Sequence, residues 1–174
     1  MKKIFFFLAL ILALVPVTIH AEGFSVLIGA QTVSFGADLG KYYDIPPGPG
    51  PALLIGFDVG VPIDLRFGRR VATEENTGED VTYQWIEAGP HFALGQKGAD
   101  LQPDVFFGVG SYDLEIGSLQ FDKALGGYAG LGIQELISEK YLGRIEVKSA
   151  VWKSDTAKTD GVSLNLALFF GARF

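Results

Sequence analysis

The sequence predicts an all-β fold, an eight-stranded antiparallel up-and-down transmembrane β-barrel. The last thirteen residues, VSLNLALFFGARF at 162–174, carry apolar side chains at every second position, which is the period of a strand. At about 3.3 Å per residue this strand is about 43 Å long, enough to cross the roughly 25 Å apolar band of a membrane barrel when tilted. Seven further alternating segments precede it, and long polar connections alternate with short turns, as in transmembrane barrels.

The first 21 residues predict a secretory signal peptide. Lys2 and Lys3 form a basic tip, an apolar run follows from Ile4 to Val17, and Ala21 precedes the expected cut. The apolar run is shorter than the roughly 20 residues that a membrane-spanning helix needs. We therefore expect a cleaved signal at 1–21 and a barrel domain at 22–174, exported to the cell outer membrane.

Composition narrows the class of protein. Removal of Lys2 and Lys3 takes the net charge from −6 to −8, because the leader holds no acidic residue, and an acidic chain argues against a nucleic-acid partner. The chain has no cysteine, which excludes disulfides and a cysteine-linked lipid. The mature sequence offers no continuous apolar helix, so within a membrane it must form a closed barrel without open edges.

The first four strands are expected at 24–35, 52–61, 63–71 and 81–94. Apolar residues occupy both faces of the first strand, so its inward face stays open. The proline- and glycine-rich segment 36–51 is expected to be a loop, neither helix nor central strand. Pro62 marks a tight turn, and 72–80 is an acidic loop. Pro90 predicts a local irregularity, since a closed barrel has no edge strand to accept a proline.

The last four strands are expected at 101–113, 122–136, 141–152 and 162–174. Short turns are expected at 95–100 and 138–140, and longer polar loops at 114–121 and 153–160. An even number of strands brings the end of the chain beside its beginning.

The alternation predicts a charged barrel interior. An eight-stranded barrel is just wide enough to be filled by side chains, and charges placed there must be paired or hydrated. We expect an interior charge network that plugs the lumen, with a narrow ion path as the alternative. The predicted interior residues are Asp64, Arg66, Arg70, Glu87, His91, Asp104, Arg144, Glu146, Lys148 and Arg173.

Two stretches carry a resemblance to a known family. LGGYAGLGIQELISEKYLGRIEVKSAVWK at 125–153 combines a glycine-rich strand, a Ser-Glu-Lys turn and an Arg-x-Glu strand, and DVFFGVGSYDL at 104–114 is similar to the preceding hairpin arm. They resemble the small eight-stranded outer-membrane β-barrel domain family, which includes the barrel of outer membrane protein A. The N-terminal half matches by pattern alone. The resemblance implies an integral outer-membrane barrel with a structural or surface-interaction role.

The final strand also resembles the closing strands of outer-membrane barrels, whose terminal aromatic is read by the assembly machinery. Phe170 and Phe174 would carry this assembly signal, although Ala172 stands at a position where an aromatic residue is also found. The partners we expect are therefore outer-membrane lipids and the barrel-assembly machinery, with the chain a monomer. The sequence identifies no specific ligand.

We expect no catalytic, metal or cofactor site. A lipid-modifying barrel enzyme would need a histidine, a serine nucleophile and an acid near the outer rim. His91, the one histidine of the mature chain, is instead expected to point inward near the periplasmic end. The acidic residues Glu74, Glu75, Glu79 and Asp80 match no EF-hand spacing, which favours a solvated loop tip over a Ca²⁺ or Mg²⁺ site.

A soluble, lipocalin-like binding barrel is the remaining alternative. It requires apolar residues inside and polar residues outside, the reverse of the arrangement expected for a barrel in lipid.

Overall fold

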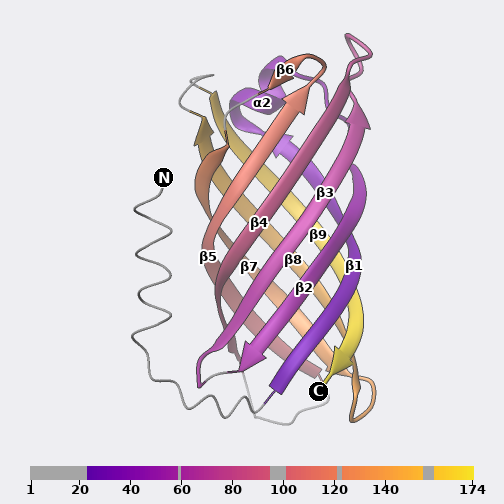
Figure 1. Ribbon diagram of the computed structural model, residues 1–174, viewed down its shortest axis with the longest axis vertical. Helices are drawn as coiled ribbons and strands as arrows, with labels where there is room; N and C mark the ends of the chain where they lie inside the picture. The colour runs from indigo at the N-terminus through magenta and orange to yellow at the C-terminus, as the bar shows by residue number, and fades with distance from the viewer. Residues whose placement is uncertain (1–22, 59, 95–100, 121–122, 155–158) are drawn as a thin grey trace.

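The computed structural model describes residues 23–58, 60–94, 101–120, 123–154 and 159–174. The signal peptide predicted at 1–21 and the turn predicted at 95–100 lie outside the described residues. Eight long strands form the wall (Figure 1): β1 (Gly23–Gly36), β2 (Gly48–Asp58), β3 (Pro62–Thr73), β4 (Asp80–Ala93), β5 (Leu101–Ile116), β7 (Ala124–Leu136), β8 (Tyr141–Ser154) and β9 (Thr159–Arg173).

Every strand pairs antiparallel with its neighbours, and the sheet closes on itself. β1 pairs with β9 from Ser25–Arg173 to Gly36–Val162, so the two ends of the barrel chain lie side by side. The pairing of β4 with β5 completes the circuit. The predicted eight-stranded up-and-down barrel is confirmed. β1 starts and β9 ends at the lower end in Figure 1, here called the terminal end, and the opposite end is called the loop end.

The burial of alternate residues settles the face assignment of β1. Leu27, Gln31 and Val33 are buried inside the barrel, while Ile28 is 68% exposed on the outer surface. Both faces contain apolar residues, which is why the sequence left the assignment open.

The prediction that 36–51 is entirely loop is wrong. A short helix, α2 (Ala37–Tyr42), follows β1, and β2 already begins at Gly48. Pro49 and Pro51 lie within β2, where they pair with β1, but the pairing of β2 with β3 starts only at Ala52. The prolines therefore lie where one side of the strand needs no backbone donor, a position that a strand tolerates.

The predicted third loop, 114–121, is also partly wrong. β5 continues to Ile116, and a two-residue strand, β6 (Leu119–Gln120), folds back onto it. β6 and α2 both lie at the loop end (Figure 1). Leu39 of α2 is buried against the barrel interior. Within the described part of the chain, no helix is long and apolar enough to cross a membrane.

The irregularity predicted at Pro90 is confirmed. The β4–β5 ladder runs to the pair Ala88–Val109 and resumes at His91–Phe106, leaving Gly89 and Pro90 without partners on β5. Pro90 keeps its place opposite Ile63 on β3. The register is the same on both sides of the gap, so the proline interrupts the ladder without shifting it.

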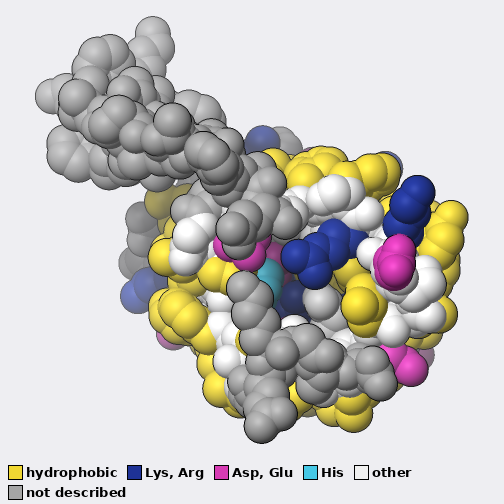
Figure 2. All heavy atoms as spheres, turned by 90° about the horizontal axis from the view of Figure 1, so that it is seen from below, with side chains coloured by type: hydrophobic (Ala, Val, Ile, Leu, Met, Phe, Trp, Pro, Cys, Tyr) yellow, Lys and Arg dark blue, Asp and Glu magenta, His cyan; other side chains and the backbone are white. Residues whose placement is uncertain are grey.

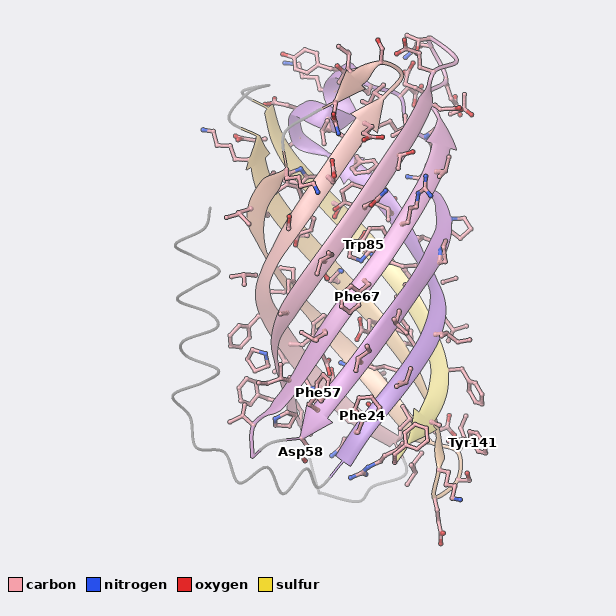
Figure 3. All side chains as sticks on the ribbon, viewed as in Figure 1. Phe24, Phe57, Asp58, Phe67, Trp85 and Tyr141 are labelled. Carbon is pink, nitrogen blue, oxygen red and sulfur yellow. The ribbon has the colours of Figure 1, made fainter. Side chains whose placement is uncertain are left out.

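The outer surface of the wall is apolar. Val109, Leu125 and Leu166 are exposed by 69%, 71% and 52%, and many other large hydrophobic side chains alternate with the buried positions in the same way. Aromatic residues gather near the terminal end, where Phe24 contacts Phe57 and Tyr141 lies at a similar height (Figure 3). The barrel thus presents to its surroundings the residues that water-soluble barrels bury.

Close packing through the wall yields a first prediction. The indole of Trp85 lies against the backbone of Gly68, where an added Cβ would be 2.0 Å from Cζ2. We expect Gly68→Ala to lower the free energy of unfolding by about 1–3 kcal/mol, the usual cost of overpacking. Urea unfolding of the refolded barrel in detergent measures this change. Gly127→Ala, whose Cβ would meet its nearest atom at 3.6 Å, is the matched control and should leave stability nearly unchanged.

Candidate functional site

The centre of the barrel toward the terminal end holds a cluster of buried charges, here called the charged layer. Four strands supply it, because each places alternate residues inward. In Figure 2, which views the molecule from the terminal end, charged side chains gather at the centre within a largely hydrophobic ring. The charged layer comprises Asp64, Arg66, Glu87, Asp104, Arg144, Glu146 and Lys148, each at most 4% exposed.

Two arginines bind the carboxylates of the lower part of this layer. Arg66 donates to Asp64 at 2.8 Å and to Glu146 at 3.0 Å. Arg144 donates to Asp104 at 2.9 Å, and its Nε lies 2.7 Å from Glu146. Arg66 therefore bridges β3 to β8 across the lumen, and Arg144 links β8 to β5, two strands away in the wall. Buried charges of this kind require such pairing, since an isolated ion would be strongly unfavourable.

A second pair lies closer to the loop end. Lys148 donates to Glu87, and the hydroxyl of Tyr112 donates to the same carboxylate at 3.1 Å. The Arg66 guanidinium also lies 4.2 Å from the ring centre of Phe106, a cation–π contact in a desolvated setting. The charged layer is thus bonded through both ion pairs and aromatic rings.

The charged layer contains four carboxylates and the side chains of two arginines and one lysine. His91 supplies a fourth basic group: its Nδ1 lies 3.0 Å from Asp64, and its side chain is 23% exposed. His91 is therefore the member of the interior set that reaches toward the open terminal end.

Above the charged layer lies a stack of rings, here called the aromatic layer and formed by Tyr83, Trp85, Tyr112 and Trp152. The centroid distances are 4.8 Å for Tyr112–Trp152, 5.3 Å for Tyr83–Trp85 and 5.4 Å for Tyr83–Trp152. All four residues are at most 5% exposed. Beyond them, toward α2, the apolar side chains of Leu39, Val81 and Ile116 are fully buried, and Arg70 is buried near the same end.

Two of the ten predicted interior residues lie apart from the charged layer. Arg70 is buried, but it donates to the backbone carbonyls of Val33 and Pro46 near the loop end. Arg173 has the inward parity yet is exposed at the terminal rim, so its assignment to the interior network is wrong. The position of a residue in the strand alternation determines whether its side chain points into or out of the barrel. Its distance from the end of the strand determines whether an inward side chain is surrounded by the barrel wall.

The interior also holds aromatic residues that the predicted charge network does not include. Tyr112 and Tyr128 bond to Glu87 and Arg66 inside the charged layer. In the alternation of their strands, Tyr83, Trp85 and Trp152 occupy the same inward positions as the interior charges, so the sequence could have placed them inside. The alternation does not show that their rings stack. Phe170 and Phe174, the predicted assembly signal, lie on the outer surface with 52% and 76% exposure.

The acidic connection between β3 and β4 is more ordered than a solvated tip. Glu74 is buried, and its carboxylate accepts from the amide and hydroxyl of Thr77 at 2.7 Å each and from the amide of Asp44 at 2.9 Å. Glu74 therefore fastens the β3–β4 connection to the segment that follows α2. Hydrogen bonds, chiefly from the Thr77 hydroxyl, hold the pKa of Glu74 at about 2 against the opposing effect of burial.

The described residues form no group of acidic, histidine or cysteine side chains suited to a metal ion. In the described part of the chain, Nδ1 of His91 lies 3.0 Å from a carboxylate oxygen of Asp64 in the charged layer.

The closed eight-stranded wall is also found in solved structures. Similar ones include Neisserial surface protein A, at 13% identity and TM-score 0.65, covering 86% of this chain and 95% of that chain. Outer membrane protein OprG from Pseudomonas aeruginosa follows at 12% identity and TM-score 0.60, covering 87% and 95%. Ail, the attachment invasion locus protein of Yersinia pestis, has 19% identity and TM-score 0.56, covering 87% and 98%.

This chain has the fold of the small eight-stranded outer-membrane β-barrels. The fold implied by the sequence resemblance is thereby confirmed. No protein-family model matches the chain, and no curated protein matches it at a significant level.

The charged layer yields a second prediction. Lys148→Met leaves Glu87 buried without its cation, so we expect a loss of about 3–5 kcal/mol in the free energy of unfolding. Adding Glu87→Gln removes the unpaired charge and should restore most of that loss. Urea unfolding in lipid vesicles measures both variants. Lys153→Met, which removes an exposed lysine from the same strand, serves as control; equal stability of the single and double variants would refute the pairing.

The buried Glu74 carboxylate in the connection between β3 and β4 yields a third prediction. Because its pKa lies at about 2 rather than 4.5, the carboxylate contributes its full stabilisation above about pH 4.5 and loses it as the pH falls through about 2. Thr77→Val should raise this pKa toward 4.5. Carbon-13 NMR of the Glu74 carboxyl against pH reports the midpoint. Thr73→Val, at an exposed threonine on β3, should leave the midpoint in place.

Proposed function

We propose that the protein is an integral outer-membrane barrel with a closed lumen, serving a structural or surface-interaction role without catalysis. The observation that carries the proposal is the opposite placement of apolar and charged side chains. Leu125, Leu131 and Val147 face outward, while Arg144 and Glu146 on the same hairpin are buried inside. In lipid this arrangement leaves apolar side chains against acyl tails and pairs the charges with one another.

The soluble binding-barrel alternative predicts the reverse placement. It needs a dry apolar interior able to hold a ligand and a polar exterior. The interior of this barrel is instead charged toward the terminal end and filled with stacked rings toward the loop end. These features favour a membrane barrel over a lipocalin-like one.

The interior packing favours a plug over an ion path. An ion entering from the terminal end meets the charged layer, whose two arginines are already bonded to carboxylates. It then meets the aromatic layer, whose rings offer little hydration. Leu39 and its apolar neighbours complete the seal below α2. Ion conduction would require several of these contacts to break together.

The loop end is the natural surface for contacts with other molecules. Tyr42 of α2 is 66% exposed there, and Glu75 and Glu79 are exposed beside the Glu74 connection. The Ail structure was solved with the heparin analogue sucrose octasulfate. The acidic connection of this chain disfavours such a polyanion, so a neutral or basic partner suits this surface better.

Localisation has a direct test. We propose that the signal at 1–21 directs export and that Phe170 and Phe174 guide assembly into the outer membrane. The expected results are recovery of the chain in the outer-membrane fraction and a gel mobility that changes on heating. A freely soluble periplasmic product would overturn the proposal.

The closed lumen yields a fourth prediction. The refolded chain in a planar bilayer should show no steady single-channel conductance, because the aromatic and charged layers fill the passage. Replacing Tyr83, Trp85 and Trp152 together with alanine removes most of the aromatic layer and should permit measurable conductance. Heat-modifiable mobility confirms that each chain is folded. Steady conductance of the unchanged chain would contradict a closed lumen.

A further inference from the structure

The outer wall carries a groove across β1 to β4. Its volume is about 820 Å³. Ile28, Leu53, Phe67 and Ile86 line it with apolar side chains. The wall is thin here, because Gly68 lies between the groove and the Trp85 ring inside the barrel. In Figure 3, Phe67 and Trp85 lie near mid-height on β3 and β4.

A cation lies beside this apolar groove. Arg69 points outward from β3 and is exposed, directly opposite the exposed Gln84 on β4. On the terminal side, the next outward pair is the apolar Phe67–Ile86. On the loop side, Val71 is 58% exposed opposite Thr82, and the polar pair Thr73–Asp80 follows. Arg69 therefore lies near the loop-end border of the apolar surface, with Val71 still beyond it.

The partners of Arg69 distinguish it from the buried arginines. Arg66 and Arg144 bind carboxylates, and Arg70 donates to two backbone carbonyls. Among the described residues, Arg69 has no ion pair, and the groove lining contains no carboxylate. An unpaired guanidinium flanked by apolar residues in lipid is unfavourable unless an anion binds it. Its planar set of N–H donors can bind two oxygens of one phosphate.

We propose that this groove binds an anionic phospholipid, with Arg69 and Gln84 holding the headgroup phosphate and an acyl chain lying over Phe67 and Leu53. The phosphate lies toward the loop end, so the lipid comes from the leaflet on that side. The long Arg69 side chain can extend along the wall to reach the headgroup. This inference rests on the membrane insertion proposed above.

The two tryptophans provide a probe for the groove. The chain contains Trp85 and Trp152, so Trp152→Phe leaves Trp85 as the sole indole, separated from the groove by the Gly68 backbone. In vesicles of phosphatidylcholine, a small fraction of brominated phosphatidylglycerol is compared with the same fraction of brominated phosphatidylcholine. Stronger quenching of Trp85 by the brominated phosphatidylglycerol is expected. Equal quenching by the two lipids overturns the proposal.

Two variants that each remove one positive charge test whether Arg69 causes the preference for phosphatidylglycerol. Arg69→Gln in the same background should reduce the relative affinity for phosphatidylglycerol by about tenfold, which corresponds to about 1.4 kcal/mol. Lys153→Gln removes one exposed cation near the loop end of β8 and should keep the preference. If Arg69→Gln retains the preference, or Lys153→Gln abolishes it, the assignment to Arg69 is wrong.

Insertion is measured separately by heat-modifiable mobility in every sample. A chain that does not insert contradicts the proposed function, whereas an inserted chain without lipid preference contradicts the groove alone. If Arg69→Gln does not fold, the comparison of the two brominated lipids with Arg69 intact still decides the proposal.

Discussion

Closure of the hydrogen-bond ladder is the constraint on which the rest of this structure depends. The pairing of β1 with β9 removes the two open edges that a sheet of eight strands would otherwise expose. Once the sheet is closed, each strand must direct alternate residues inward and outward. The narrow interior then fixes where charges are placed, because inward side chains meet partners from strands on the opposite side. Arg66 of β3, for example, reaches Glu146 of β8.

The interior combines two kinds of packing that perform different tasks. Ion pairs in the charged layer specify which strands face one another, since each guanidinium fits carboxylates at defined positions. The aromatic layer instead fills volume, because rings such as Tyr112 and Trp152 stack over a large area. Together the two layers occupy the described interior between the terminal end and the apolar residues below α2.

Alternation in the sequence was enough to predict the wall and most of the charged layer. Glu87 and Lys148 could be placed inside from parity alone, whereas their contact depends on the register between strands that are distant in sequence. Helix α2 was not predicted because it is short and is flanked by a segment rich in glycine and proline, which are typical of loops. Arg173 was misplaced because alternation does not show where the barrel ends. Glu74 was expected in water because its buried bonds to Thr77 and Asp44 involve a loop conformation that no periodicity encodes.

The interruption at Gly89 and Pro90 has a mechanical consequence. The bonds that are absent there belong to one seam, between β4 and β5, while Pro90 remains aligned with Ile63 on the other side. Because the register is identical above and below the gap, both strands stay aligned although two residues of β4 have no ladder partner on β5. Near its terminal end, beside His91, the wall is therefore held at this seam by fewer backbone hydrogen bonds than along the rest of the β4–β5 ladder.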